Sequence, residues 1–219
     1  IENKGNIIHP NDHVNMGQSS NDVIPTAIHI SSLLMVEEKL LPALNNLSDD
    51  LFSKSKEFNK ILKIGRTHLQ DATPMTLGQE FSGYHQIIKN NIKQINQSKK
   101  ILSSLAQGGT AVGTGINTHK DFGKLIAEQI SKETKIKFSK CNNHFEAQSF
   151  QNGTVYFSGV LKTLAIGFHK IANDIRWLGS GPRSGIGELL VPAVQPGSSI
   201  MPGKVNPVIC ESAIQVCSQ

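Results

Sequence analysis

The sequence has few of the residues that mark a disulfide framework or a membrane span. Its three cysteines, Cys141, Cys210 and Cys217, form no CxxC pair and no metal-type cluster. Their odd number argues against a complete disulfide framework and favours a reducing compartment. No apolar run approaches the ~20 residues that a membrane-spanning helix needs, so the sequence predicts no membrane partner.

Aromatic residues are also scarce, at 5% of the chain, and none is interleaved with a basic run. The net charge of +5 is dispersed, because Lys and Arg occur singly or in pairs such as Lys99–Lys100. This pattern argues against nucleic-acid binding and favours a solvated surface with a mild basic excess. The same excess also suits a protein that collects small dianions.

The length of 219 residues permits one or two domains. The chain begins at Ile1 without an initiator Met and stops at Gln219 inside an apolar pattern that lacks a cap. We therefore expect it to be the middle of a longer protein.

Helical periodicity dominates the chain. Apolar residues recur at steps of three and four over residues 33–51, and residues 19–22 (Ser-Ser-Asn-Asp) supply N-cap candidates ahead of them. Pro42 falls inside this run and is predicted to kink the helix.

Two more long helical patterns cover residues 74–102, with Pro74 in the first turn, and residues 157–178, where the spacing is close to 3.5 residues. A shorter helix is expected over residues 121–134. A helix of 30 residues extends about 45 Å, and its single apolar stripe needs partners. The predicted fold is therefore mainly α, a long-helix bundle that also packs on other subunits.

Three polar connections, residues 9–21, 64–76 and 181–207, are predicted loops, where functional sites are usually found. A fourth segment, residues 108–115, is rich in glycine. It lacks the Gly-Lys-Ser/Thr of a P-loop and the third glycine of a dinucleotide fingerprint, and it follows a helix instead of a strand. Close backbone packing explains these glycines better than nucleotide binding.

The last of the three loops contains two hydroxyls, a lysine and an amide within residues 197–207. One interpretation is a segment that closes over an anionic ligand, with Lys204 as a point charge and Asn206 as a directional donor. The other is an ordinary surface loop.

In the middle loop, Thr67 stands beside His68, whose side chain suits proton transfer near neutral pH. A structural histidine is the alternative. In the first loop, Ser19 begins either a simply capped helix or a helix start that also binds an anion.

Taken together, these segments resemble the signature regions of the fumarase/aspartase superfamily. Residues 197–207 match its pattern GSSxMPxKxNP at every fixed position, and the resemblance extends to residues 108–117, 145–147 and 180–183. Four positions are similar to class II fumarases, where aspartases usually have Asn, Thr, Gln and Ala. These four are His9, Ser20, His68 and Gly203.

The resemblance implies that the bundle is the central domain of this family. Residues 1–21 would be an active-site loop leading into the bundle, residues 22–180 the bundle itself, and residues 181–219 a mobile signature loop with the start of the next helix. The family's N- and C-terminal domains would lie outside this chain. Members are homotetramers in which three subunits contribute one signature loop each to every active site.

The implied activity is fumarate hydratase, the reversible addition of water to fumarate to give L-malate in the tricarboxylic acid cycle, without a metal or an organic cofactor. Ser198 would take the C3 proton of malate, and His68, supported by Glu211, would act through a bound water. The substrate carboxylates would be held by Ser19, Ser20, Asn21, Thr67, Ser199, Lys204 and Asn206. A secondary dicarboxylate site would contain His9, Asn11 and Asp12.

The resemblance leaves rival functions open. An aspartate ammonia-lyase or another lyase of the superfamily is the nearest, and a non-catalytic structural protein is a different class, since the superfamily has been recruited for lens crystallins. The implied location is the cytoplasm in bacteria, and the mitochondrion plus the cytosol in eukaryotes. Because two domains would be missing, we expect the 219-residue piece to be weakly active or inactive alone.

Overall fold

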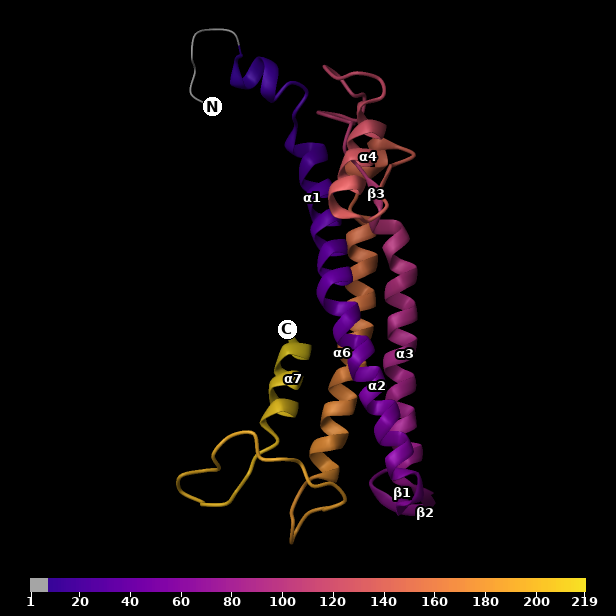
Figure 1. Ribbon diagram of the computed structural model, residues 1–219, viewed down its shortest axis with the longest axis vertical. Helices are drawn as coiled ribbons and strands as arrows, with labels where there is room; N and C mark the ends of the chain where they lie inside the picture. Colours follow the sequence, from indigo (N-terminus) through magenta and orange to yellow (C-terminus); the bar gives the residue numbers. More distant parts are fainter. Residues whose placement is uncertain (1–7) are drawn as a thin grey trace. The chain divides into compact units, whose positions relative to one another are not determined.

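The computed structural model describes residues 8–219 (Figure 1). Its chain is mainly α, which confirms the predicted fold class. The α-helices of this range are α1 (Ser20–Met35), α2 (Leu41–Glu57), α3 (Leu77–Leu102), α4 (Phe122–Thr134), α5 (His144–Ser149), α6 (Asn152–Leu178) and α7 (Val208–Ser218). The strands are β1 (Leu62–Thr67), β2 (Gln70–Thr76), β3 (Ser104–Leu105) and β4 (Ser139–Lys140), of which β1–β2 pair antiparallel and β3–β4 parallel.

The chain divides into two compact units. Unit 1 contains Ile1–Asn46 and Ile92–Ser158, and unit 2 contains Leu47–Asn91 and Gly159–Gln219. The long helices α2, α3 and α6 each contribute residues to both units. Of the helices in residues 8–219, none is both long enough and apolar enough to cross a membrane.

The first long helical run is interrupted ahead of Pro42. Ser19 caps α1, with its Oγ accepting a hydrogen bond from the Asn21 backbone N–H at 3.1 Å, as predicted. Between α1 and α2 lies a π-helical turn, η2 (Val36–Leu40), in which the Leu41 N–H donates to the Val36 carbonyl. Because Pro42 has no N–H and its ring crowds the carbonyl four residues earlier, the ordinary hydrogen-bond ladder cannot pass it. The predicted disturbance therefore takes the form of a π-turn.

The second long helix begins later than predicted. Pro74 lies in β2, opposite Ile64, and the helix α3 starts at Leu77. The prediction that Pro74 occupies the first turn was wrong, because a capping box sets the start. The Gln79 N–H donates to Thr76 Oγ1 at 3.2 Å, and the Thr76 N–H donates to Gln79 Oε1 at 2.9 Å.

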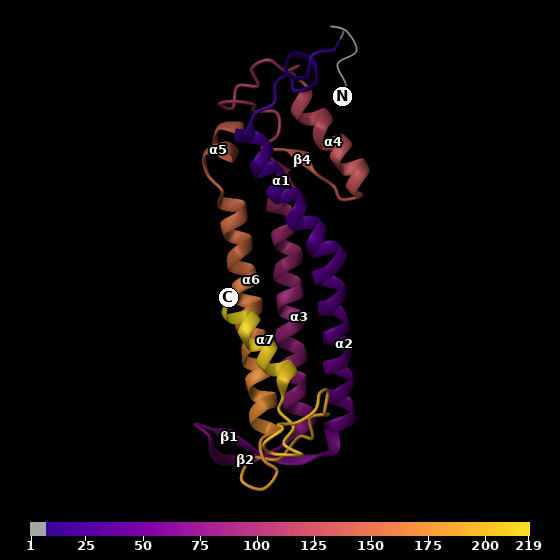
Figure 2. The ribbon, with the colours of Figure 1, turned by 90° about the vertical axis from the view of Figure 1, so that its left-hand side faces the viewer.

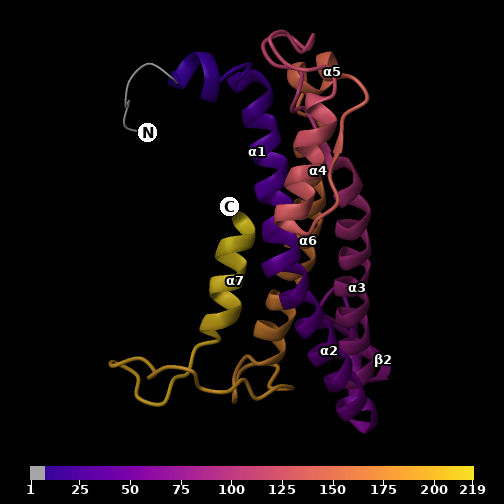
Figure 3. The same ribbon diagram turned by 45° about the horizontal axis from the view of Figure 1, so that its top comes forward.

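Unit 1 contains η1 (Pro10–Val14), α1, the C-terminal part of α3, and α4 and α5 with the glycine-rich segment that precedes α4 (Figure 3). Its core includes Leu33, Ile95 and Leu102, which are all buried. The helix expected over residues 121–134 is confirmed as α4. Close packing in the glycine-rich segment is also confirmed, because a Cβ on Gly108 would lie 2.5 Å from the Gly123 Cα.

Unit 2 contains the N-terminal part of α3, the C-terminal part of α6, the β1–β2 hairpin and α7 (Figure 2). The short 3₁₀-helix η3 (Phe58–Lys60) leads into the hairpin. Ile88 is fully buried in this unit, and its burial contributes about 2 kcal/mol to folding. The third predicted helix is α6, which ends at Leu178 as expected.

Candidate functional site

The first candidate loop lies in unit 1 and carries the π-helix η1. His9 caps this turn, because the Asp12 backbone N–H donates to His9 Nδ1 at 3.2 Å. Asp12 Oδ2 lies 3.2 Å from the same nitrogen, so a protonated ring pairs with the carboxylate instead. His9, Asn11 and Asp12 are neighbours on one exposed turn, where they remain available to a ligand.

The start of α1 places three further candidate residues. The Oγ of Ser19 is engaged in capping the helix. Asn21 donates from Nδ2 to the Ala111 carbonyl at 2.7 Å, while Ser20 is exposed. The helix start is thus fixed to the glycine-rich segment, and free backbone N–H groups at this end favour an anion.

Asp22 holds the same junction from inside, a role that we did not predict. Its side chain is fully buried, and Oδ2 accepts from the backbone N–H groups of Gly108 at 3.0 Å and Thr110 at 2.9 Å. Gln107 Nε2 lies 3.2 Å from the same oxygen. The only sequence signal was an acidic residue in the first turn of a helix, which is too common to be informative.

The second candidate loop is a β-hairpin of unit 2. Thr67 pairs with Gln70, so only His68 and Leu69 form the turn, and their φ angles are 54° and 63°. Two positive φ values define a type I′ turn, which normally carries Asn-Gly. Each residue without the freedom of glycine costs about 1–3 kcal/mol in such a conformation. The turn holds His68 at an exposed tip at the expense of local strain.

We expect Leu69→Asn to stabilise the protein by about 1 kcal/mol, because asparagine tolerates the left-handed conformation. Little burial is lost, since Leu69 is 71% exposed. The free energy of unfolding from urea titration measures the change. Leu62→Asn is the matched control, because Leu62 is 74% exposed in the same hairpin without a positive φ. If both substitutions changed the free energy of unfolding equally, the inferred backbone strain at Leu69 would be contradicted.

The third candidate loop also belongs to unit 2. It closes on itself, because the Ser198 N–H donates to the Lys204 carbonyl at 3.3 Å and the Lys204 N–H donates to the Met201 carbonyl at 3.1 Å. A Cβ on Gly197 would lie 2.5 Å from the Lys204 carbonyl oxygen, so this approach requires glycine. Ser199 lies within the closed segment and is exposed.

A cavity of about 400 Å³ connects this loop with the turn after α6. Lys204 and Asn206 line it together with Gly179–Pro182. A lysine and an asparagine among the lining residues suit a small carboxylate ligand, and the volume lies in the range of small-molecule sites. Ser198 is not among the lining residues.

In the part of the chain that the structure describes, the predicted catalytic side chains do not contact one another through hydrogen bonds or ion pairs. Within residues 8–219, no hydrogen bond or ion pair connects the side chains of His68, Ser198 and Glu211. Glu211 lies in the first turn of α7. The same range contains no group of three His, Cys, Asp or Glu side chains placed to hold a metal ion. The roles of these three residues stay predictions.

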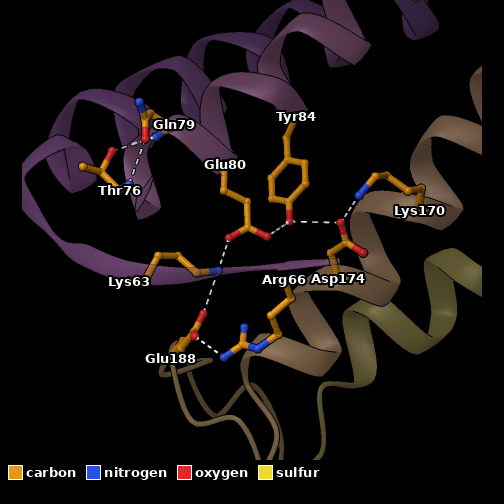
Figure 4. A network of polar contacts seen from close by, with 9 residues as sticks. All are labelled: Lys63, Arg66, Thr76, Gln79, Glu80, Tyr84, Lys170, Asp174 and Glu188. Carbon is orange, nitrogen blue, oxygen red and sulfur yellow. Dashed lines mark hydrogen bonds and ion pairs between the residues drawn. The ribbon is translucent and has the colours of Figure 1, made fainter. Parts of the chain in front are cut away.

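Instead, a network of charges surrounds the base of the hairpin (Figure 4). Lys63 forms an ion pair with Glu80, and its Nζ lies 2.7 Å from Glu188 Oε2. Arg66 donates to Glu188 Oε1 at 2.5 Å. Burial alone would raise the pKa of Glu188, but hydrogen bonds from Arg66 and Lys63 and their positive charges outweigh it and lower that pKa. The hydrogen bond to Glu188 likewise raises the pKa of Arg66.

The lowered pKa gives Glu188 a defined pH dependence. The stabilisation is complete above the unfolded carboxyl pKa of about 4.3 and is lost as the pH falls through the lower folded value. We expect Glu188→Gln to lower the free energy of unfolding by roughly 2 kcal/mol at pH 7, and by progressively less below pH ~4. Urea titrations between pH 7 and pH ~2 measure this free energy of unfolding.

Glu57→Gln, which removes the exposed Lys54–Glu57 pair, is the control and should cost less than about 1 kcal/mol. If the loss of unfolding free energy caused by Glu188→Gln stayed constant down to pH ~2, the stabilisation would not come from the ionised carboxylate of Glu188.

Comparison with known proteins places these features in a family. A family model described as a lyase matches residues 2–219. The mitochondrial fumarate hydratase of Saccharomyces cerevisiae is 58% identical over 212 residues, which cover 97% of this chain and 43% of the yeast protein. The class II fumarate hydratase of Rickettsia bellii is 57% identical, with coverage of 97% and 46%. The chain thus spans less than half the length of these relatives.

A solved structure agrees with the sequence relatives. The recombinant class II fumarase from Schistosoma mansoni superimposes with a TM-score of 0.93 at 42% identity, covering 97% of this chain and 47% of that chain. The chain therefore belongs to this lyase family, and the relatives that it resembles are fumarate hydratases of class II and of mitochondria.

Proposed function

We propose that the full-length protein is a fumarate hydratase, which adds water reversibly to fumarate to give L-malate. The observation that carries this proposal is the 58% identity to a fumarate hydratase over 97% of the chain. The cavity beside Lys204 and Asn206 supports it, because both side chains suit a carboxylate.

In this proposal, the residues of the three loops hold the substrate. Its carboxylates are bound by Ser19, Ser20, Asn21, Thr67, Ser199, Lys204 and Asn206. Removal of the C3 proton of malate places a second negative charge on the adjacent carboxylate. The positive charge of Lys204 and the amide of Asn206 are suited to stabilise that charge as it develops.

Proton transfer is assigned to two side chains on opposite sides of the substrate. Ser198 takes the C3 proton, and His68 acts through a bound water with support from Glu211. A turn of two exposed residues leaves His68 accessible to such a water. His9, Asn11 and Asp12 form a secondary dicarboxylate site on their shared exposed turn.

We further propose a homotetramer with active sites shared between subunits. Support comes from an apolar groove of about 480 Å³ between α6 and α7, lined by Leu161, Phe168, Ile209 and Val216 among others. We also propose that the chain divides into an active-site loop (residues 1–21), a helix bundle (residues 22–180) and a signature loop with the next helix (residues 181–219). A role in the tricarboxylic acid cycle and a location in the cytoplasm or the mitochondrion are part of the same proposal. The names of the relatives favour the mitochondrion in a eukaryote.

An absorbance assay of the full-length protein tests this function. Added fumarate should lose its ultraviolet absorbance in the absence of ammonia, and added L-malate should produce the same absorbance. A reaction that requires ammonia would show an aspartate ammonia-lyase instead. If the protein reacts with neither acid, the alternative is a non-catalytic structural protein.

A further inference from the structure

The hairpin that carries Thr67 and His68 has two cations at its base. In a regular strand, residues 63 and 66 point to opposite faces. The register of β1 against β2 shifts between Ile64 and Arg66, and such an irregularity twists the ribbon locally. A Cβ on Gly65 would lie 2.9 Å from the Thr73 carbonyl oxygen, so glycine permits the close crossing. The irregularity lets Lys63 and Arg66 reach the same carboxylate (Figure 4).

That carboxylate belongs to Glu188, on the segment that leads from α6 to the 197–207 loop. Its backbone N–H donates to the Leu178 carbonyl at 2.8 Å, which fixes the segment to the end of α6. The side chain of Glu188 is only 18% exposed, and that of Lys63 only 7%. A paired charge with this little solvent holds its partners more firmly than a surface pair.

The far side of the network extends the same anchor. The hydroxyl of Tyr84 lies 3.0 Å from Glu80 Oε1 and 3.1 Å from Asp174 Oδ2, and Asp174 pairs with Lys170. Burial, followed by the neighbouring carboxylates, raises the pKa of Tyr84, so its phenol stays a donor. The hairpin is thereby linked to α3 and α6.

The charges of this network cancel. Its three cations are Lys63, Arg66 and Lys170, and its three carboxylates are Glu80, Asp174 and Glu188. A site that binds an anionic substrate needs surplus positive charge, which is missing here. The network therefore has a structural role. It fixes the strand β1, and with it the strained turn at His68 that follows this strand.

We propose that Glu188 is a positioning residue of the enzyme, which through Arg66 and Lys63 fixes the His68 turn for proton transfer. This rests on the proposed function. Misplacement of a catalytic group by about 1 Å costs on the order of 10²-fold in rate. We expect Glu188→Gln to lower kcat by about 10²-fold while KM changes by less than about 3-fold, because Glu188 contacts no substrate group in this assignment and Thr67 is the one carboxylate-binding residue of the seven that lies on this hairpin.

A double-mutant cycle with His68→Asn separates positioning from general destabilisation. Once the imidazole is gone, Glu188→Gln should lower the residual kcat, measured at high enzyme concentration, by less than about 3-fold. Glu37→Gln removes the Lys99–Glu37 pair of unit 1 and should leave kcat unchanged. Circular dichroism confirms folding, and if Glu188→Gln does not fold, Arg66→Lys takes its place in the cycle.

The outcomes are distinct. An equal loss of kcat from Glu188→Gln with and without His68, or a kcat as high as that of Glu37→Gln, would overturn the positioning role. Failure of the proposed function looks different, because then the wild-type protein does not hydrate fumarate or His68→Asn keeps the wild-type turnover.

Discussion

Ser198→Ala in the full-length protein is expected to lower the proposed kcat for malate dehydration by about 10³-fold, with KM within a few-fold of the wild-type value. A positioned general base contributes about 10²–10⁴-fold, and alanine removes the oxygen that would take the C3 proton. Binding survives, because the backbone contact of residue 198 with Lys204 does not involve the side chain. Steady-state kinetics with L-malate gives both constants.

The control for this substitution is Ser184→Ala, an exposed serine between α6 and the cavity-lining loop with no proposed role. It should keep wild-type kinetics. His68→Asn should resemble Ser198→Ala in lowering kcat more than binding. Wild-type turnover of Ser198→Ala would remove this residue from the mechanism while leaving the membership of the family intact.

Asp22→Ala should lower the free energy of unfolding by about 3–5 kcal/mol, the largest stability effect that we expect from one side chain. Its carboxylate accepts from two buried backbone N–H groups, those of Gly108 and Thr110. Alanine leaves both donors without a partner, and each such loss costs about 1–3 kcal/mol. The midpoint of urea unfolding measures the change.

Asp50→Ala is the matched control, because Asp50 is an exposed aspartate of α2. That substitution should change the free energy of unfolding by less than about 0.5 kcal/mol. If Asp22→Ala were equally mild, the glycine-rich segment would not depend on the carboxylate, and the start of α1 would be held mainly by the Asn21–Ala111 contact.

The helices were predictable because each signal is local. The 3.5-residue spacing of apolar residues ended at Leu178, and α6 ends there too. Ser19 was a cap candidate by residue type alone, and its hydroxyl caps α1. The glycines of residues 108–115 predicted close backbone packing, which the approach of Gly108 to Gly123 confirms.

The hairpin and its anchor were missed for physical reasons. A type I′ turn usually carries Asn-Gly, so His68 and Leu69 gave no sequence signal for the turn. Pro74 suits the first turn of a helix, but it lies in β2. Thr76 and Gln79 did carry a readable capping-box signal. Glu188 lies 122 residues from Arg66, a separation over which no local periodicity carries information.

The central claim is that Lys204 and Asn206 hold a dicarboxylate within reach of Ser198. The most direct measurement is a crystal structure of the full-length protein with L-malate bound. We predict one carboxylate within about 3 Å of Lys204 Nζ and Asn206 Nδ2, and Ser198 Oγ facing the C3 carbon. A bound diacid with Lys204 and Asn206 turned away from it, or with Ser198 out of reach of that carbon, would contradict the account.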